Sequence, residues 1–148
     1  MTDLATADPR LAEDVRAAFA VGKHCTIATL RADGSPRISG TEVEFEDGHL
    51  YVGTPVDARK AADIRRDPRV AIHSPTRDPR PDGSWPGEAK VSGVAVEVPV
   101  PAGYPPGSLR FRIDLTSAVF TDLSDESPPR LRIRFWRPGE PAVTVFRT

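Results

Sequence analysis

The sequence predicts a mainly β protein, a small barrel of about six to eight strands with a few short helices, in one domain over residues 1–148. Two observations predict this fold. Apolar residues recur at the two-residue period of strands over much of the chain, while helical spacing is confined to two short stretches. Turn-forming Gly, Pro and Asp residues separate the strand segments. Closure into a barrel is the economical way to cover both edges of such a sheet.

The first predicted element is a helix that begins at Asp8 and Pro9. Aspartate is a favoured N-cap residue, and proline is favoured at the first helical position. Apolar residues then recur at helical spacing from Leu11 to Phe19, and Gly22 ends the helix.

Three strands are predicted to follow as a meander. They cover residues 26–30, 36–45 and 49–54, with turns at 32–35 and 46–48. Both turns contain an Asp-Gly pair, which is a strong signal for a tight connection between antiparallel strands.

A second helix is predicted near residues 57–66, with Asp57 as its N-cap, and Pro68 opens the next strand. Residues 74–88 then contain four prolines and two glycines, which predicts a long irregular loop and a candidate binding loop. A second proline-rich excursion is expected over residues 99–108. The remaining predicted strands cover residues 69–73, 90–98, 109–122, 130–137 and 142–147.

Composition narrows the class of protein. The chain has 20 basic and 21 acidic residues, a balance that indicates neither a nucleic-acid nor a membrane partner. One cysteine, Cys25, cannot form an intramolecular disulfide and fits a reducing compartment. No signal peptide or membrane span is recognisable, so we expect a cytoplasmic protein. The three histidines lack the spacing of metal ligands, so no metal site is expected.

The most informative feature is the pair of cations at the start of the second helix. Arg59 and Lys60 fall in its first turn, where like charge opposes the helix dipole unless an anion is bound. Arginine binds a phosphate bidentately and lysine acts as a mobile point charge. The alternative is a pair of solvated surface charges beside Asp57 and Asp63.

Three segments, in this order, resemble the pyridoxamine 5′-phosphate oxidase-like superfamily. TIATLRADGSPRISG at residues 26–40 resembles its first hairpin, and residues 53–70 resemble the end of its third strand with the helix and strand that follow. FWRPG at residues 135–139 resembles its terminal strands. The resemblance covers residues 10–98 well and the C-terminal third loosely, and it is closest to small actinobacterial members. It implies a Greek-key-like split β-barrel and a homodimer with cofactor sites at the interface.

The resemblance also implies site residues. In that superfamily the arginine–lysine pair binds the cofactor phosphate, the preceding strand end contacts the ribityl chain or phosphate, and the second hairpin strand lies along the ring system. A residue of the fifth strand reaches the cofactor from the partner subunit. In this sequence the matching positions are Arg59 and Lys60, then Thr54 (with Val52 and Gly53), then Arg37, Ile38 and Ser39, and finally Lys90 or Ser92.

The function implied is a flavin-dependent oxidoreductase acting on a small organic substrate, with FMN as cofactor. The alternatives are a reductase that uses the deazaflavin coenzyme F-420 and a non-catalytic carrier or sensor of a flavin or tetrapyrrole. Pyridoxamine phosphate oxidation itself is not expected, because the C-terminal arginine–histidine substrate motif is missing from FWRPGEPAVTVFRT. No catalytic residue is assigned, since the cofactor would carry the hydride chemistry itself.

Overall fold

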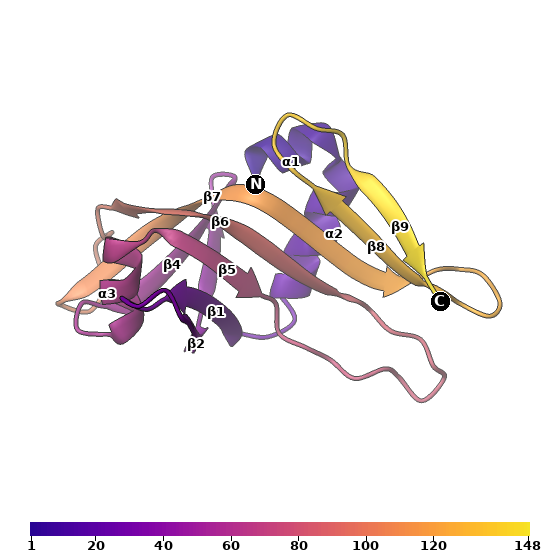
Figure 1. The fold of residues 1–148 in the computed structure, drawn as a ribbon, viewed down its shortest axis with the longest axis horizontal. Helices are drawn as coiled ribbons and strands as arrows, with labels where there is room; N and C mark the ends of the chain where they lie inside the picture. The colour runs from indigo at the N-terminus through magenta and orange to yellow at the C-terminus, as the bar shows by residue number, and fades with distance from the viewer.

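A computed structural model describes all residues, 1–148, as a nine-stranded antiparallel sheet with three helices (Figure 1). Strands make up 45% of the chain and helices 17%, so the predicted mainly β class is confirmed. The helices are α1 (Thr2–Ala7), α2 (Pro9–Phe19) and α3 (Arg59–Arg66). The strands are β1 (Cys25–Leu30), β2 (Pro36–Thr41), β3 (Val43–Glu46), β4 (His49–Pro55), β5 (Arg69–His73), β6 (Glu88–Val98), β7 (Ser108–Leu123), β8 (Leu131–Trp136) and β9 (Val143–Arg147).

The sheet has the order β2-β1-β5-β6-β7-β4-β3, and β8 and β9 extend it from the C-terminal half of β7. Strands β2 and β3 form the two ends of this path, yet Glu42 alone separates them in the chain. The sheet must therefore curl until its two ends meet. No ladder joins β2 to β3, so the curled sheet is consistent with a split barrel.

The predicted strand over residues 36–45 is therefore two strands, and the prediction of a three-strand meander is wrong in its number of strands. Its first half pairs with β1 and its second half with β4. The chain bends at Glu42 because the two halves belong to opposite ends of one curled sheet. Period-two alternation continues through such a bend, so it carries no signal of the break.

The N-cap of one predicted helix is confirmed, and that of the other is shifted by one residue. Asp8 caps α2 by accepting a hydrogen bond from the Leu11 N–H at 2.9 Å, as predicted. The N-cap of α3 is Ala58 rather than Asp57, and no side chain caps this helix. The short helix α1 was not expected; it packs Leu4 into the core, and Thr2 donates to the Gly48 carbonyl at 3.1 Å.

The main core lies between α2 and the inner face of the sheet. Its largest fully buried side chains include Trp136 of β8 and Phe111 of β7. Each large side chain buried in this way contributes roughly 1.5–3 kcal/mol.

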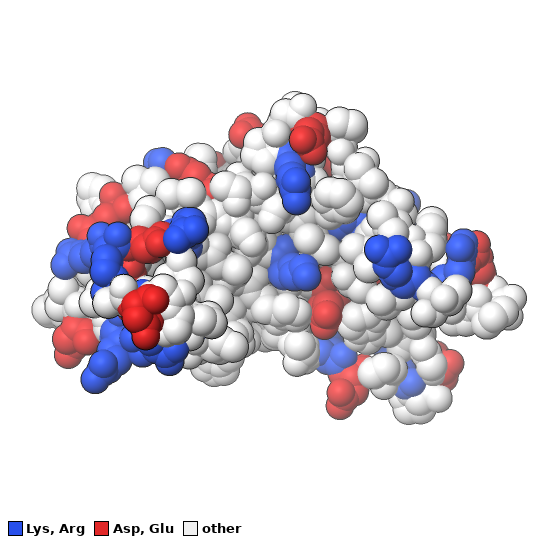
Figure 2. Space-filling model, in the orientation of Figure 1, with Lys and Arg blue, Asp and Glu red and all other residues white.

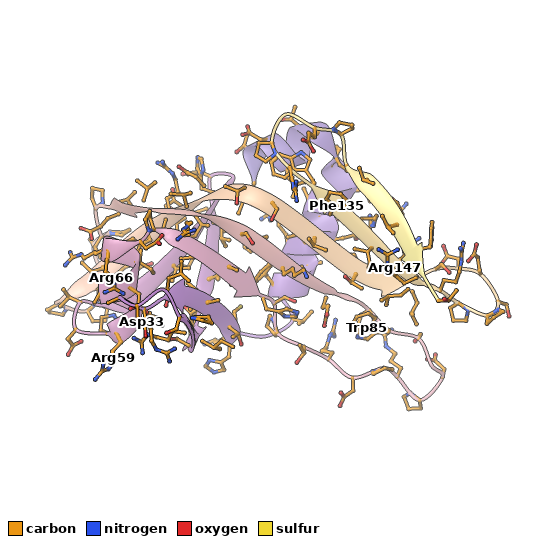
Figure 3. All side chains as sticks on the ribbon, in the orientation of Figure 1. Asp33, Arg59, Arg66, Trp85, Phe135 and Arg147 are labelled. Carbon is orange, nitrogen blue, oxygen red and sulfur yellow. The ribbon has the colours of Figure 1, made fainter.

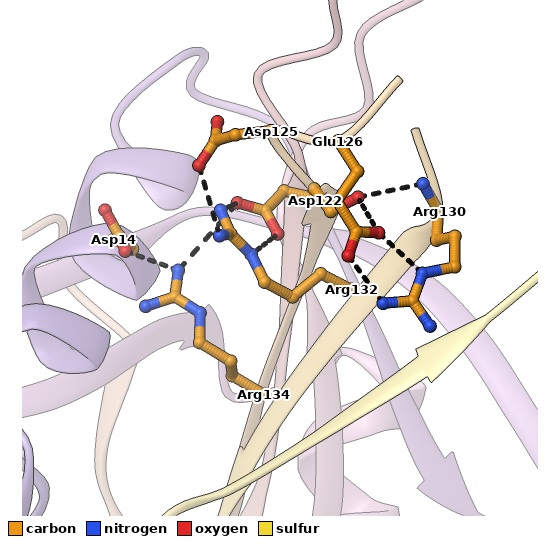
Figure 4. A network of polar contacts seen from close by, with 8 residues as sticks. Asp14, Asp122, Asp125, Glu126, Arg130, Arg132 and Arg134 are labelled. Carbon is orange, nitrogen blue, oxygen red and sulfur yellow. Dashed lines mark hydrogen bonds and ion pairs between the residues drawn. The ribbon is translucent and has the colours of Figure 1, made fainter. Parts of the chain in front are cut away.

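Alternate residues of β8 face α2 and β7 through ion pairs (Figure 4). Arg134 pairs with Asp14 of α2, and Arg132 pairs with Asp122 of β7 at 2.6 Å. Arg130 pairs with Glu126 in the connection between β7 and β8. The Arg134–Asp14 pair joins this face of β8 to α2, and the intervening residues of β8 point to the other side of the sheet. None of the three helices is long and apolar enough to cross a lipid bilayer.

Candidate functional site

One face of α3 and the hairpin formed by β1 and β2 enclose a pocket of about 410 Å³ that is dominated by arginine. Figure 3 shows Asp33, Arg59 and Arg66 gathered at this end of the molecule, and Figure 2 shows the charged side chains that crowd around it. Four arginines against two aspartates leave two positive charges uncompensated. We call this the arginine pocket; its lining residues are Arg31, Ala32, Asp33, Arg37, Arg59, Ala62, Asp63 and Arg66.

Helical spacing places half of the lining on one side of α3. Arg59, Ala62, Asp63 and Arg66 are separated by three or four residues, so they form a single stripe along the helix. Arg59 is exposed and has no ion pair or side-chain hydrogen bond within the chain. Since no side chain caps α3 either, the start of this helix offers both backbone N–H groups and a free guanidinium.

Asp63 is the buried centre of the pocket wall, with a residue exposure of 2%. Its Oδ2 accepts hydrogen bonds from Thr29 Oγ1 and Arg37 Nε, each at 2.7 Å. Its Oδ1 accepts one from Arg66 Nη2 at 2.9 Å. The Arg37 guanidinium, helped by Thr29 and Arg66, outweighs burial and lowers the pKa of Asp63 to about 2. The carboxylate is therefore charged throughout the physiological range.

The β1–β2 register explains how two of these donors reach one oxygen. Thr29 and Arg37 are directly opposite each other in the antiparallel pair, so both side chains leave the same face of the hairpin. Arg66 donates a second hydrogen bond, to the Leu30 carbonyl at 2.9 Å, and Arg31 donates to the Pro36 carbonyl. Three of the four arginines are thus held by the chain itself.

Lys60 points to a different neighbour from Arg59. Its Nζ donates to the Gly40 carbonyl of β2 at 2.7 Å, and burial lowers the pKa of this amine. Strand β2 pairs only with β1, so its other edge is open, and Lys60 lies along that edge. Lys60 does not line the arginine pocket.

The structure brings together only part of the predicted set. Arg37 and Arg59 share the arginine pocket, and Lys60 contacts β2 three residues beyond Arg37. The next two β2 positions differ in exposure: Ile38 is 74% exposed and Ser39 is half-buried. Thr54 is buried in β4, and Lys90 is exposed on β6 opposite His73 and Val119, away from the pocket.

Four charged lining residues were not among the predicted site residues: Arg31, Asp33, Asp63 and Arg66. A signal for two of them exists in the sequence, because Asp63 and Arg66 follow Arg59 at helical spacing. No comparable signal exists for Arg31, whose place depends on how the hairpin folds against α3.

A larger hollow of about 770 Å³ lies between α1, α2 and the β3–β4 turn. Its lining mixes small apolar residues with scattered charges, and its one cation, Arg16, lies over the Phe45 ring at 5.5 Å. It lacks a convergent set of polar groups, so the smaller arginine pocket is the better candidate site.

The fold and the pocket define a split-barrel protein with an arginine-lined pocket at the start of α3. The chain belongs to the pyridoxamine 5′-phosphate oxidase family, whose family model matches residues 11–113. No curated protein matches the chain by sequence.

Solved structures share the fold at low sequence identity. PhzG from Burkholderia lata 383, in complex with tetrahydrophenazine-1-carboxylic acid, is 14% identical, with a TM-score of 0.64 over 98% of this chain and 91% of that one. A pyridoxamine 5′-phosphate oxidase-related, FMN-binding protein from Nostoc punctiforme PCC 73102 is 10% identical, with a TM-score of 0.65 over 95% and 96%. An F420 reductase is 18% identical, with a TM-score of 0.54 over 70% and 94%.

Proposed function

We propose that this protein binds FMN, with the cofactor phosphate in the arginine pocket, and acts as a flavin-dependent oxidoreductase on a small organic substrate. The observation that carries the proposal is the pocket itself. It is an arginine-lined pocket at an uncapped helix start, beside an open strand edge, in a chain of the pyridoxamine 5′-phosphate oxidase family.

The charge of the pocket favours a phosphate monoester. A monoester carries about 1.5 to 2 negative charges at neutral pH, which matches the two uncompensated positive charges of the lining. The phosphodiester of the deazaflavin coenzyme carries one negative charge at this position. FMN is therefore our first candidate and the deazaflavin the second, which the fold of the F420 reductase supports.

The remaining predicted residues fit roles around such a ligand. Arg59 would bind the phosphate together with Arg37, and the open edge of β2 would offer backbone groups to a planar ring. Lys60, whose Nζ donates to the Gly40 carbonyl, would place a cation between the phosphate and the ring of the ligand. A bound flavin supplies hydride-transfer chemistry, while the chain orients it and excludes water.

We also propose that two copies pack together through one face of the sheet. Because Arg134 faces α2 and Arg132 lies on the same face, the intervening residues of β8 point to the other side, where their partners on β7 and β9 are apolar except for Thr121 and Arg147. Figure 2 shows mostly white surface over β8 and β9, with basic side chains standing on it. The outer apolar face, as we call it, comprises Val119, Leu123, Leu131, Ile133, Phe135, Val143 and Val145.

A second copy is the partner that this face fits, because a largely apolar patch can complement itself about a two-fold axis, and its few charged neighbours, Glu88, Lys90 and Arg147, include both signs. Lys90 pairs in register with Val119 and therefore lies on the same side of the sheet. This position agrees with the expectation that Lys90 contacts the cofactor of the partner subunit. We place the dimer in the cytoplasm, in line with the single buried thiol of Cys25.

The test is a comparison of FMN with riboflavin, which lacks only the phosphate. Fluorescence titration of the purified protein should show FMN binding at least tenfold tighter than riboflavin. Arg59→Ala should weaken FMN binding by roughly 1.5–3 kcal/mol, the usual value of a charged hydrogen bond, and leave riboflavin unchanged. Arg10→Ala, which removes an exposed arginine of α2 that lies outside the arginine pocket, is the matched control.

Three other outcomes would change the assignment. Equal affinity for FMN and riboflavin would mean that the arginine pocket is not the phosphate site. Tighter binding of the deazaflavin than of FMN would make the second candidate the cofactor. Bound FMN that neither a reduced nicotinamide nor a reduced deazaflavin turns over would indicate a carrier or sensor.

A further inference from the structure

We propose that Asp63 is the positioning residue of the arginine pocket, which holds Arg37 and Arg66 in the orientation that binds a phosphate dianion. The inference rests on the proposed function for the identity of the anion, but not for the geometry of the pocket. Asp63 itself is 2% exposed and acts only through the arginines that it holds.

The contacts of Asp63 leave one side of each arginine available. Arg37 donates to the Asp63 carboxylate through Nε. Arg66 donates through Nη2 to both the Asp63 carboxylate and the Leu30 carbonyl. A guanidinium has five N–H donors, so both side chains retain donors for a ligand. Since both residues line the pocket, those donors are available at its wall.

Holding an arginine in advance lowers the cost of binding. A free arginine side chain gives up rotamer freedom when it grips an anion, whereas one already bonded to a carboxylate has given it up on folding. Arg59, which has no partner, supplies the adaptable contact, and the Asp63 cluster supplies the fixed wall.

Asp63 also links three elements of the fold. Its three donors come from β1, β2 and the last turn of α3, so the carboxylate sets how the helix lies against the hairpin. The same bonds therefore define both the shape of the pocket and the direction of its arginines.

If Asp63 positions the arginines, Asp63→Asn should weaken FMN binding; if Asp63 only screens their charge, the same change should strengthen it. This change removes a negative charge from the pocket, so a residue that merely screened the arginines would give tighter FMN binding once removed. A positioning residue gives weaker binding, because the asparagine amide replaces one acceptor oxygen by an NH2 group, which then faces the donor of Arg66 or that of Arg37. We expect the FMN affinity to fall about tenfold and riboflavin to be unaffected.

Asp63→Glu separates position from charge in a second way. It keeps the carboxylate and moves it by one methylene, so a charge effect alone leaves the preference for FMN over riboflavin unchanged. We expect this preference to fall here as well. Asp67→Asn is the matched control, because Asp67 also pairs with an arginine, Arg69, and has a pKa of about 2, yet lies outside the pocket.

The results are read as the ratio of the riboflavin to the FMN dissociation constant. A ratio that falls about tenfold in both Asp63 variants, and holds in Asp67→Asn, supports the proposal. The proposal is overturned by tighter FMN binding in Asp63→Asn, by an unchanged ratio in Asp63→Glu, or by riboflavin binding that weakens in step with FMN.

Inorganic phosphate keeps this test independent of the flavin. Titration of phosphate, followed by the NMR signals of the arginine Nε–H groups, should shift Arg37 in the wild-type protein and not in Asp63→Asn. If this occurs while neither flavin binds, Asp63 keeps its role and the flavin assignment falls. If phosphate shifts no arginine signal of the wild-type protein, the positioning role is overturned.

Discussion

At the scale of one residue, Asp63 both orients the arginines of the candidate site and contributes to the stability of the folded protein. Its carboxylate is buried and its pKa is lowered to about 2, chiefly by Arg37. A carboxylate whose pKa is lower in the folded state stabilises the protein above its ordinary pKa, near 4, and loses that contribution as the pH falls towards 2. A lowering of this size corresponds to about 2 kcal/mol at neutral pH.

We therefore expect the wild-type protein to lose its advantage over Asp63→Asn between pH 4 and pH 2. Urea unfolding of both proteins at several pH values measures the difference in unfolding free energy. Asp67→Asn should show a smaller pH-dependent change, because the Asp67 carboxylate is more exposed and its ion pair is screened by water. A difference between wild type and Asp63→Asn that stays constant from pH 7 to pH 2 would contradict the assigned pKa.

The sequence carried only some of the information about this cluster. Arg37 and Arg59 were indicated by family resemblance, and they do meet in one pocket. In the sequence Asp63 stands out only as an acidic neighbour of Arg59 and Lys60, because its hydrogen bonds reach 26 and 34 residues along the chain and no periodic pattern encodes them. Local chemistry identifies which residues bind anions, whereas the partners that orient them depend on how the sheet closes.

At the scale of elements, the bulge at Thr116 of β7, opposite Ser92 and Gly93 of β6, shows a backbone constraint that composition does not reveal. The β6–β7 register shifts between Ser92 and Gly93. A Cβ atom on Gly93 would lie 2.5 Å from the Asp114 carbonyl oxygen and 2.7 Å from Ile113 Cγ2. Since backbone cannot move aside cheaply, only glycine fits this position.

Gly93→Ala should therefore destabilise the protein by roughly 1–3 kcal/mol, the usual cost of forcing atoms into a packed region. Gly40→Ala is the matched control, because a Cβ atom there meets nothing within 4 Å. Chemical denaturation of the two variants should show a loss of stability for Gly93→Ala and little change or a small gain for Gly40→Ala. Equal stability of the two variants would mean that β7 adjusts to the added methyl group.

Elements with complete local signals were predicted well, and the misses have local explanations. The Asp8-Pro9 helix start and the strand boundaries from β5 onwards agree closely with the structure. Helix α1 has no side-chain N-cap and is only six residues long, and α3 begins one residue later than an Asp57 cap would require. An N-cap motif states that a helix can begin, but contacts of α3 with β1 and β4 decide where it does.

At the scale of the whole molecule, strand order is what the sequence could not supply. Residues 36–45 read as one strand, yet the two halves close a seven-strand path from opposite ends. That closure creates both the open edge of β2 and the pocket between its hairpin and α3. The same sheet, extended by β8 and β9, creates the outer apolar face on the side away from α2.

The outer apolar face leads to the last prediction, which concerns assembly. Val143 and Val145 lie on this face of β9, while Thr144 and Phe146 lie on its other face, beside Arg134 and Arg132 in the register. Val143→Asp with Val145→Asp places two charges in the proposed interface, where burying an unpaired charge is costly. This variant should be a monomer at micromolar concentration in light-scattering chromatography, whereas the wild-type protein elutes as a dimer.

Thr144→Asp with Phe146→Asp adds the same charge to the opposite face and should remain dimeric. FMN affinity should fall with the dimer, because Lys90 of the partner would no longer reach the cofactor. A wild-type protein that is monomeric at these concentrations, or a control variant that dissociates equally, would refute the interface.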